Sequence, residues 1–213
     1  MDAHGMIALK HTPLWSVSMS LVSKQVAALV LTAIASLVVV PAYAAQPKTS
    51  GAAPAQKVSL LGSKFNFTLP KGFTATPLPA GDAAQGTAGA KGTMYSNATS
   101  KTVVITAENT IIDGSNVKDD DSTFLDATMA DFAVQKIKAL PDAKILSEKS
   151  LTQKGTGLGL RQLDTKATQG GGPTLDTTLL GASGTRMAVV QIISRASDKA
   201  GHEALVKQIV AGQ

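Results

Sequence analysis

The feature that most constrains the fold is a series of four strand-like segments in the second half of the chain, joined by very short links. The segments span residues 144–153, 158–168, 174–180 and 186–194. Each link is four or five residues long and contains glycine: KGTG, QGGGP and GASG. A parallel neighbour would need a crossover of roughly a dozen or more residues, whereas short glycine-bearing links are typical of hairpins. The pattern therefore predicts an antiparallel meander.

Three more strands are predicted upstream of this meander. Residues 58–69 (VSLLGSKFNFTL) end with two phenylalanines and a leucine that alternate with polar residues, which indicates one half-buried strand. Residues 93–96 and 101–109 form two further short strands, joined as a hairpin by the polar residues between them. The intervening residues 77–92 are rich in alanine, glycine and proline, so we expect a long mobile loop there.

Two helices are predicted, one before the meander and one after it. Residues 122–140 carry apolar side chains at three- and four-residue steps, so one face of this helix should be buried. These side chains belong to Leu125, Met129, Phe132, Ile137 and Leu140. The last helix, at about 197–210, should direct Leu205, Ile209 and Val210 inward. The order of elements predicts an α+β fold: an antiparallel β-sheet of about six or seven strands with flanking helices.

The beginning of the chain carries the pattern of a secretory signal peptide. The apolar run at residues 26–40 would span roughly 22 Å as a helix, short of the roughly 30 Å hydrocarbon core of a membrane. Pro41 ends the run, and Ala42-Tyr43-Ala44 gives the small-x-small pattern that signal peptidase recognises. We expect cleavage after Ala44, with an uncleaved signal anchor as the alternative.

The chain contains no cysteine, which removes both disulfides and the thiol that a bacterial lipid anchor needs. A cleaved product should therefore be soluble in the periplasm. The segment before the apolar run is long for a signal peptide, and we hypothesise that translation starts at Met19. The predicted organisation is a signal peptide at 1–44, a flexible leader at 45–56 and a single folded domain at 57–213.

Positive charge is mild and scattered along the chain. The formal net charge is +5, and the lysines and arginines form no cluster with aromatic residues between them. Nucleic-acid-binding proteins usually concentrate basic residues on one stripe, often with aromatic platforms. We therefore expect no nucleic-acid partner.

Two short stretches resemble ligand-binding motifs but have simpler interpretations. Residues 155–159 (GTGLG) have strand-like sequence on both sides, whereas a phosphate-binding loop leads into a helix. We interpret them as a hairpin turn. Residues 119–121 (DDD) are contiguous, whereas a calcium loop spaces its acidic ligands and ends with a glutamate. Acidic residues at the start of a helix are stabilised by the positive end of the helix dipole. We therefore interpret residues 119–121 as a helix start, with a metal site as the weaker alternative.

Groups for nucleophilic catalysis are few. After the predicted cleavage site the chain has one histidine, His202, which we expect to be exposed on the polar side of the last helix. The sequence contains no G-x-S-x-G nucleophile pattern. Pairs of carboxylates that meet only in space stay open as an alternative. We assign no catalytic, cofactor-binding or metal-binding residue, and we predict neither a cofactor nor enzyme activity.

Three segments carry a resemblance to a known family: residues 58–73 (VSLLGSKFNFTLPKGF), residues 92–108 (GTMYSNATSKTVVITAE), and the stretch from Gln162-Leu163-Asp164 through LLGASGTRMAVVQI. They resemble the DcrB family of enterobacterial cell-envelope lipoproteins. The likeness covers roughly residues 57–213 and consists of strand patterns and turns. It implies a Mog1/PsbP-like fold, an αβα sandwich. It offers no motif of functional residues to transfer, and this chain lacks the lipid-anchor cysteine.

The resemblance implies a non-enzymatic binding module. Related domains act as chaperones for hydrophobic segments of secreted toxins, and others assist the assembly of membrane complexes. We therefore expect a soluble periplasmic accessory protein that binds an envelope protein or a hydrophobic segment. The alternatives are a small-ligand carrier and a carboxylate-based envelope hydrolase.

Overall fold

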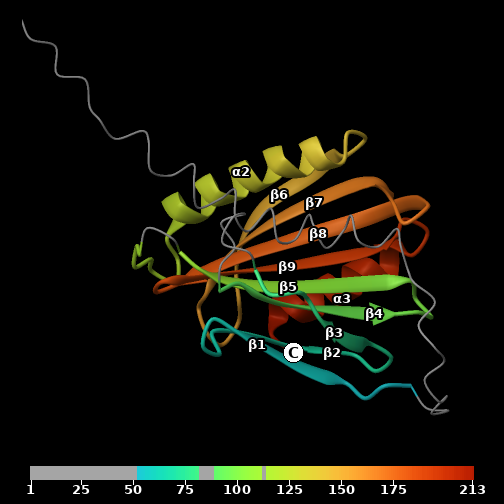
Figure 1. Cartoon of the computed structure of the whole chain (residues 1–213), viewed down its shortest axis with the longest axis horizontal. Helices are drawn as coiled ribbons and strands as arrows, with labels where there is room; N and C mark the ends of the chain where they lie inside the picture. The colour runs from blue at the N-terminus through green and yellow to red at the C-terminus, as the bar shows by residue number, and fades with distance from the viewer. Residues whose placement is uncertain (1–51, 82–88, 112–113) are drawn as a thin grey trace, which may run out of the picture.

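The computed structural model describes residues 52–81, 89–111 and 114–213 (Figure 1). Its centre is an antiparallel sheet of seven strands in the order β3-β4-β5-β9-β8-β7-β6. The strands are β3 (Thr74–Pro77), β4 (Lys91–Asn97), β5 (Thr102–Thr110), β6 (Lys144–Thr152), β7 (Gly159–Gln169), β8 (Gly172–Ser183) and β9 (Arg186–Arg195). Helices α2 (Ser122–Ala139) and α3 (Lys199–Ala211) lie on opposite faces of the sheet. The predicted α+β fold is confirmed.

The meander β6–β9 agrees closely with the sequence prediction. The largest difference is in β8, which begins two residues earlier and ends three residues later than predicted. Gly170 and Gly171, with φ of 55° and 79°, form a two-residue turn between β7 and β8. Such a turn requires positive φ at both positions, which glycine adopts without strain. The ladder therefore continues to the ends of both strands.

The single strand predicted at residues 58–69 is wrong. The segment forms a hairpin of β1 (Gln56–Leu60) and β2 (Phe65–Leu69), which make a separate two-stranded sheet. Leu61, Gly62 and Ser63 have φ of 52°, 62° and 71° and reverse the chain. Leu61 is buried, and its N–H donates to Glu108 Oε2 at 3.1 Å. Glu108 lies 47 residues after Leu61, and this contact stabilises the left-handed backbone of the turn. The alternation of residues within 58–69 does not predict that turn.

The expected loop at 77–92 is shorter than predicted. Pro77 ends β3, while Lys91 and Gly92 begin β4, and residues 82–88 lie outside the described residues. At the start of the described chain, the Ala53 carbonyl accepts a 2.8 Å hydrogen bond from the N–H of Gly72. The predicted signal peptide, the cleavage site after Ala44 and most of the predicted leader lie outside the described residues.

Helix α2 has the predicted limits but a different buried face. Asp121 caps it by accepting a 3.0 Å hydrogen bond from the N–H of Phe124. Leu125, Met129 and Phe132 are buried as expected. Ile137, predicted to be buried, is 42% exposed, and the preceding residue Lys136 is only 1% exposed. Lys136 follows Phe132 by four residues, which places it on the same face, where its ammonium meets Asp176 at 2.6 Å.

Two apolar cores lie on the two faces of the sheet. One is between α2 and the sheet and includes Leu125, Phe132 and Leu180. The other lies between the opposite face, α3 and the β1–β2 hairpin, and includes Phe65 and Ile209. Figure 1 shows the hairpin on the side of the sheet away from α2. Each fully buried large side chain contributes about 1.5–3 kcal/mol relative to exposure.

Candidate functional site

Helix α3 leaves part of its face of the sheet uncovered. It packs against β2, β9 and β8 but not to a similar extent against β6 and β7. The uncovered area forms the floor of a groove of about 820 Å³ between α3 and strands β6–β8. Ligand-binding clefts usually have volumes of roughly 300–1,000 Å³. This groove, which we call the α3 groove, is large enough for a small molecule or for several residues of a peptide.

The α3 groove combines apolar and basic side chains. Its apolar residues are Leu146, Leu151, Leu175, Val206 and Val210, and its lysines are Lys149, Lys154, Lys199 and Lys207. Lys149 pairs with Asp164 at 3.2 Å, and Lys199 pairs with Glu203 at 3.7 Å. Among the described residues, Lys154 and Lys207 form no ion pair. The groove therefore offers an apolar surface with two uncompensated positive charges.

A chain of hydrogen bonds lies at the inner wall of the groove. His202 joins α3 to the sheet: its Nδ1 lies 3.1 Å from Ser194 Oγ, and its Nε2 lies 2.9 Å from Thr177 Oγ1. The Thr177 hydroxyl donates to Asp164 Oδ1 at 2.6 Å. That hydroxyl has a single proton, so it must accept from Nε2–H. When the imidazole is neutral, its Nδ1 then accepts from the Ser194 hydroxyl.

The prediction that His202 is an exposed surface residue is wrong. Its exposed fraction is 5%, and it lies on the same face of α3 as Leu205, Val206 and Ile209. These positions follow His202 by three, four and seven residues, the spacing of one helix face. The helical spacing therefore indicated that His202 is buried. The prediction of an exposed side chain gave more weight to the polarity of histidine than to this spacing.

Burial lowers the pKa of His202 below its ordinary value, although the nearby carboxylates of Asp176 and Asp164 oppose this effect. In Asp164, burial and hydrogen bonds act on the pKa in opposite directions. Burial alone would raise the pKa, but hydrogen bonds from Ser147, Thr177 and other neighbours stabilise the carboxylate and hold the pKa below its ordinary value. At neutral pH, His202 is therefore a neutral imidazole and Asp164 is an ionised carboxylate.

The order serine, histidine, hydroxyl, carboxylate superficially resembles a catalytic triad. Ser194 is only 1% exposed, so a substrate carbonyl has no access to its hydroxyl. Thr177 also stands between the imidazole and Asp164, so the carboxylate does not orient the histidine directly. The arrangement is suited to fixing α3 against β8 and β9.

A buried ion pair occupies the opposite face of the sheet. Lys136 and Asp176, with side chains 1% and 0% exposed, are 2.6 Å apart. The Lys136 ammonium also donates to Thr178 Oγ1 at 3.2 Å, and Gln191 Nε2 donates to Asp176 Oδ2 at 2.6 Å. The two charges neutralise each other within the α2-side core, so this pair is a structural connection between α2 and β8.

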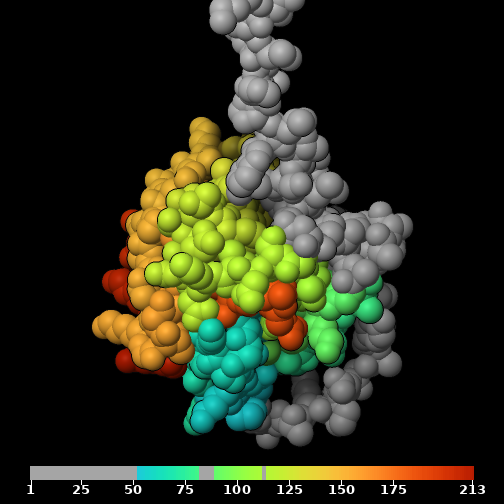
Figure 2. All heavy atoms as spheres, turned by 90° about the vertical axis from the view of Figure 1, so that its left-hand side faces the viewer, coloured from blue at the N-terminus to red at the C-terminus, as the bar shows by residue number. Residues whose placement is uncertain are grey.

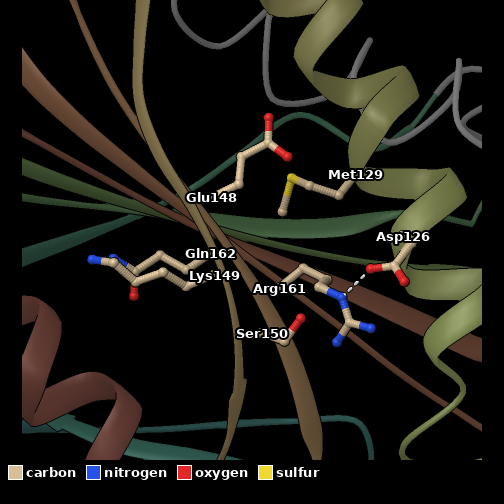
Figure 3. A pocket seen from close by; sticks show the side chains of 7 residues that line it. All are labelled: Asp126, Met129, Glu148, Lys149, Ser150, Arg161 and Gln162. Atoms are coloured by element: carbon tan, nitrogen blue, oxygen red, sulfur yellow. Dashed lines mark hydrogen bonds and ion pairs between the residues drawn. The ribbon is translucent and has the colours of Figure 1, made fainter.

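A second, smaller pocket of about 260 Å³ lies on the α2 side of β6. Figure 3 shows Asp126 and Met129 of α2 facing Arg161 of β7, with Glu148 of β6 beside them. Arg161 and Asp126 form an ion pair. Lys149 of β6 points to the other side of the sheet, toward the α3 groove. We call this second site the α2 pocket.

The two motif-like stretches have structural roles. Residues 155–158 lie in the turn between β6 and its antiparallel neighbour β7, and Gly159 is the first residue of β7, so the hairpin interpretation is confirmed. In the acidic stretch, Asp121 caps α2, while Asp119 binds Lys64 and accepts a 2.7 Å hydrogen bond from Ser183. Within the described ranges, no three His, Cys, Asp or Glu side chains gather as a metal site would require.

None of the helices in the described part of the chain has the length and apolar character needed to cross a membrane.

No family model and no curated protein sequence matches this chain. Among solved structures, it is similar to cyanobacterial PsbP (CyanoP) from Synechocystis sp. PCC 6803, with a TM-score of 0.51 and 10% identity over 77% of this chain and 96% of that one. The chain has a PsbP-like fold. A Pseudomonas aeruginosa protein of unknown function, PA94, aligns with a TM-score of 0.42 and 14% identity over 75% of this chain and 95% of its own.

Proposed function

We propose that this chain is a non-enzymatic accessory protein of the cell envelope that holds a segment of another envelope protein in the α3 groove. The observation that carries the proposal is the groove itself: about 820 Å³, open to solvent, partly apolar and bordered by lysines. The polar groups at its inner wall bind one another, so they are not poised for reaction. A surface of this kind favours binding over catalysis.

The resemblance of residues 57–213 to the DcrB family supports an envelope role. Domains of that kind bind hydrophobic segments or assist the assembly of membrane complexes. The PsbP-like fold agrees with the fold that this resemblance implies. Fold alone does not determine function, so the proposal depends chiefly on the chemistry of the groove.

The proposed location is the periplasm. The apolar run at residues 26–40 and the Ala42-Tyr43-Ala44 pattern support export and cleavage after Ala44. The absence of cysteine supports a released product without a lipid anchor.

A small-ligand carrier is the second candidate, because the groove volume is within the usual range for small molecules. The carboxylate-based hydrolase has less support. Asp164, a groove carboxylate, receives hydrogen bonds from Ser147, Gln162 and Thr177 and has a lowered pKa, so it is unsuited to be a general acid.

Affinity capture with crosslinking from a periplasmic extract tests the proposed function. The baits are the wild-type protein, a double variant with Leu151→Glu and Lys207→Glu in the groove, and a control with Val134→Glu. Val134 is 50% exposed and lies on α2, away from the groove. We expect one partner to bind wild type and control and to be lost with the groove variant. Equal recovery of that partner by all three proteins would overturn the proposal.

If the ligand is a small molecule instead, no protein is captured. Native mass spectrometry of the protein purified from the envelope then shows a bound mass that the groove variant lacks. This outcome would replace the proposed function by the carrier function.

A further inference from the structure

Strand β6 is an edge of the large sheet. It pairs with β7 on one side, and no other strand in the described part of the chain pairs with its outer side. It has nine residues, whereas β3 at the opposite edge has four. Figure 2 shows the amber and orange region of β6 and β7 at the margin of the surface, beside the yellow-green α2. An edge strand of this length presents a row of backbone N–H and C=O groups to a second chain.

A pocket lies on each side of this edge. Glu148 pairs with Leu163, which belongs to the α2-side core, and Leu151 pairs with Leu160, which belongs to the α3-side core. Alternate residues of β6 therefore point to opposite faces. Glu148 and Ser150 line the α2 pocket, while Ser147 and Leu151 line the α3 groove. A strand added beside β6 would direct its own side chains alternately into the two pockets.

Two neighbouring exposed apolar side chains, Ile145 and Leu146, lie at the beginning of the same strand. Among the described residues, the large apolar side chains with high exposure are Val134, Ile137, Ile145 and Leu146, at 50%, 42%, 42% and 50%. Ile145 and Leu146 belong to β6. Ile137 follows Asp126 by about three helical turns, so it lies on the side of α2 that faces the α2 pocket. Adjacent exposed apolar residues such as Ile145 and Leu146 often mark interaction sites.

The two sides of the strand differ in charge. On the groove side, Lys154 and Lys207 have no ion-pair partner among the described residues. On the α2 side, Arg161 is neutralised by Asp126, and Glu148 has no ion-pair partner in the described part. An added strand would match this surface best with acidic residues toward the groove and basic residues toward α2.

We propose that β6 binds an extended segment of a partner protein as an eighth strand, with alternate side chains in the α3 groove and the α2 pocket. The segment has apolar residues near Ile145 and Leu146, acidic residues on the groove side and a basic residue near Glu148. This inference rests on the proposed function and specifies how the partner binds. Backbone hydrogen bonds supply affinity, and the two pockets supply specificity.

A second copy of this chain fits the edge less well. Antiparallel pairing of two β6 strands along their full length would place Glu148 opposite the same residue of the other copy, and like charges in that position are destabilising. The irregularity between Ile145 and Ser147 and the lysines of β6 also discourage indiscriminate pairing. Residues 147–152 remain regularly paired with β7 and are suited to a specific partner strand.

A library of random ten-residue peptides displayed on phage, selected on the intact domain, tests this inference. We expect enriched peptides whose acidic and basic residues alternate in the predicted way. Leu146→Lys should weaken their binding at least about tenfold, which corresponds to about 1.4 kcal/mol. Val134→Lys is the matched control, because both residues are 50% exposed. If no peptide is enriched more strongly on the wild-type protein than on the Leu146→Lys variant, the inference is overturned.

Backbone N-methylation of a selected peptide tests strand addition without changing the protein. Methyl groups at every second residue, where N–H groups face β6, should abolish binding, and methyl groups at the intervening residues should leave it unchanged. If methylation has the same effect on binding at every peptide position, whether binding is lost or retained, strand addition is overturned. In that case a peptide that still depends on Leu151 and Lys207 would leave the proposed function standing. A dimer that Leu146→Lys dissociates would identify the occupant as a second copy and overturn the partner-segment inference.

Discussion

At the residue scale, the two faces of the sheet each contain one buried polar connection between a helix and the strands. On the α2 face it is the Lys136–Asp176 ion pair, and on the α3 face it is His202 between Thr177 and Ser194. Buried polar groups destabilise a fold unless their hydrogen-bonding capacity is satisfied. Each connection therefore fixes the position of a helix more narrowly than apolar packing does.

Lys136→Met should lower the free energy of unfolding by about 3–5 kcal/mol, because it leaves the Asp176 carboxylate buried without its counter-charge. The double variant Lys136→Met with Asp176→Leu should recover much of this loss. Urea denaturation measures both effects, and Lys138→Met, at an exposed position of the same helix, is the control. A loss below about 1 kcal/mol for Lys136→Met would show that the pair is not part of the core.

His202 should make stability depend on pH near neutrality. Its pKa is lowered in the folded state, so as pH falls below about 6.5 the unfolded chain binds a proton that the folded protein does not. Stability is thus full above this pH and decreases below it. His202 is the only histidine after the predicted cleavage site, so the His202→Gln variant should lose this slope between pH 7 and 5. An unchanged slope in urea denaturation would show that His202 does not cause the pH dependence.

Asp164 acts in a lower pH window. Its lowered pKa means that its stabilisation is present above the unfolded value of 3.8 and is lost as pH falls through the folded value. The histidine and carboxylate effects therefore occur in separate pH ranges.

At the element scale, the acidic stretch before α2 has one residue with a specific role. Asp121→Ala should lower the free energy of unfolding by about 1 kcal/mol, because the N–H of Phe124 loses its acceptor. Asp120→Ala is the control, since Asp120 is an exposed neighbour that does not cap the helix. If the two variants lose equal free energy of unfolding in thermal or urea denaturation, the effect comes from negative charge near the start of α2 and not from the cap.

The meander and both helices were predictable because their signals are local. Glycine links set the hairpins of β6–β9, and the three- and four-residue spacing of Leu125, Met129 and Phe132 sets the inner face of α2. The β1–β2 reversal depends on the contact of Leu61 with Glu108, which is remote in sequence. Such a contact has no signal in the local pattern.

The candidate site was less predictable than the fold. Lys136 is buried because Asp176, from a different element, neutralises it, and the sequence does not show that pairing. The α3 groove exists because α3 packs against β2, β8 and β9, and its position over the sheet follows from three-dimensional packing. Burial of His202 was the exception, since its spacing from Leu205 and Ile209 indicates it.

At the scale of the whole molecule, the proposed export predicts a defined mature start. Protein recovered from the periplasm should begin at Ala45 by N-terminal sequencing, because Ala42 and Ala44 fit the small-residue positions that signal peptidase recognises. Replacement of Ala44 by leucine should block the cleavage and retain the longer chain. A wild-type product that still contains residues 26–40 would support the signal-anchor alternative.

The central claim is that the α3 groove and the β6 edge together form the surface that binds a partner. Photo-crosslinking in living cells tests it most directly, with a photoreactive residue placed in turn at Lys207 in the groove, Leu146 on β6 and Val134 on the outer face of α2. We expect Lys207 and Leu146 to crosslink the same partner segment and Val134 to crosslink none. A partner crosslinked equally well from Val134, or different partners from Lys207 and Leu146, would show that the groove and the β6 edge do not form one binding surface.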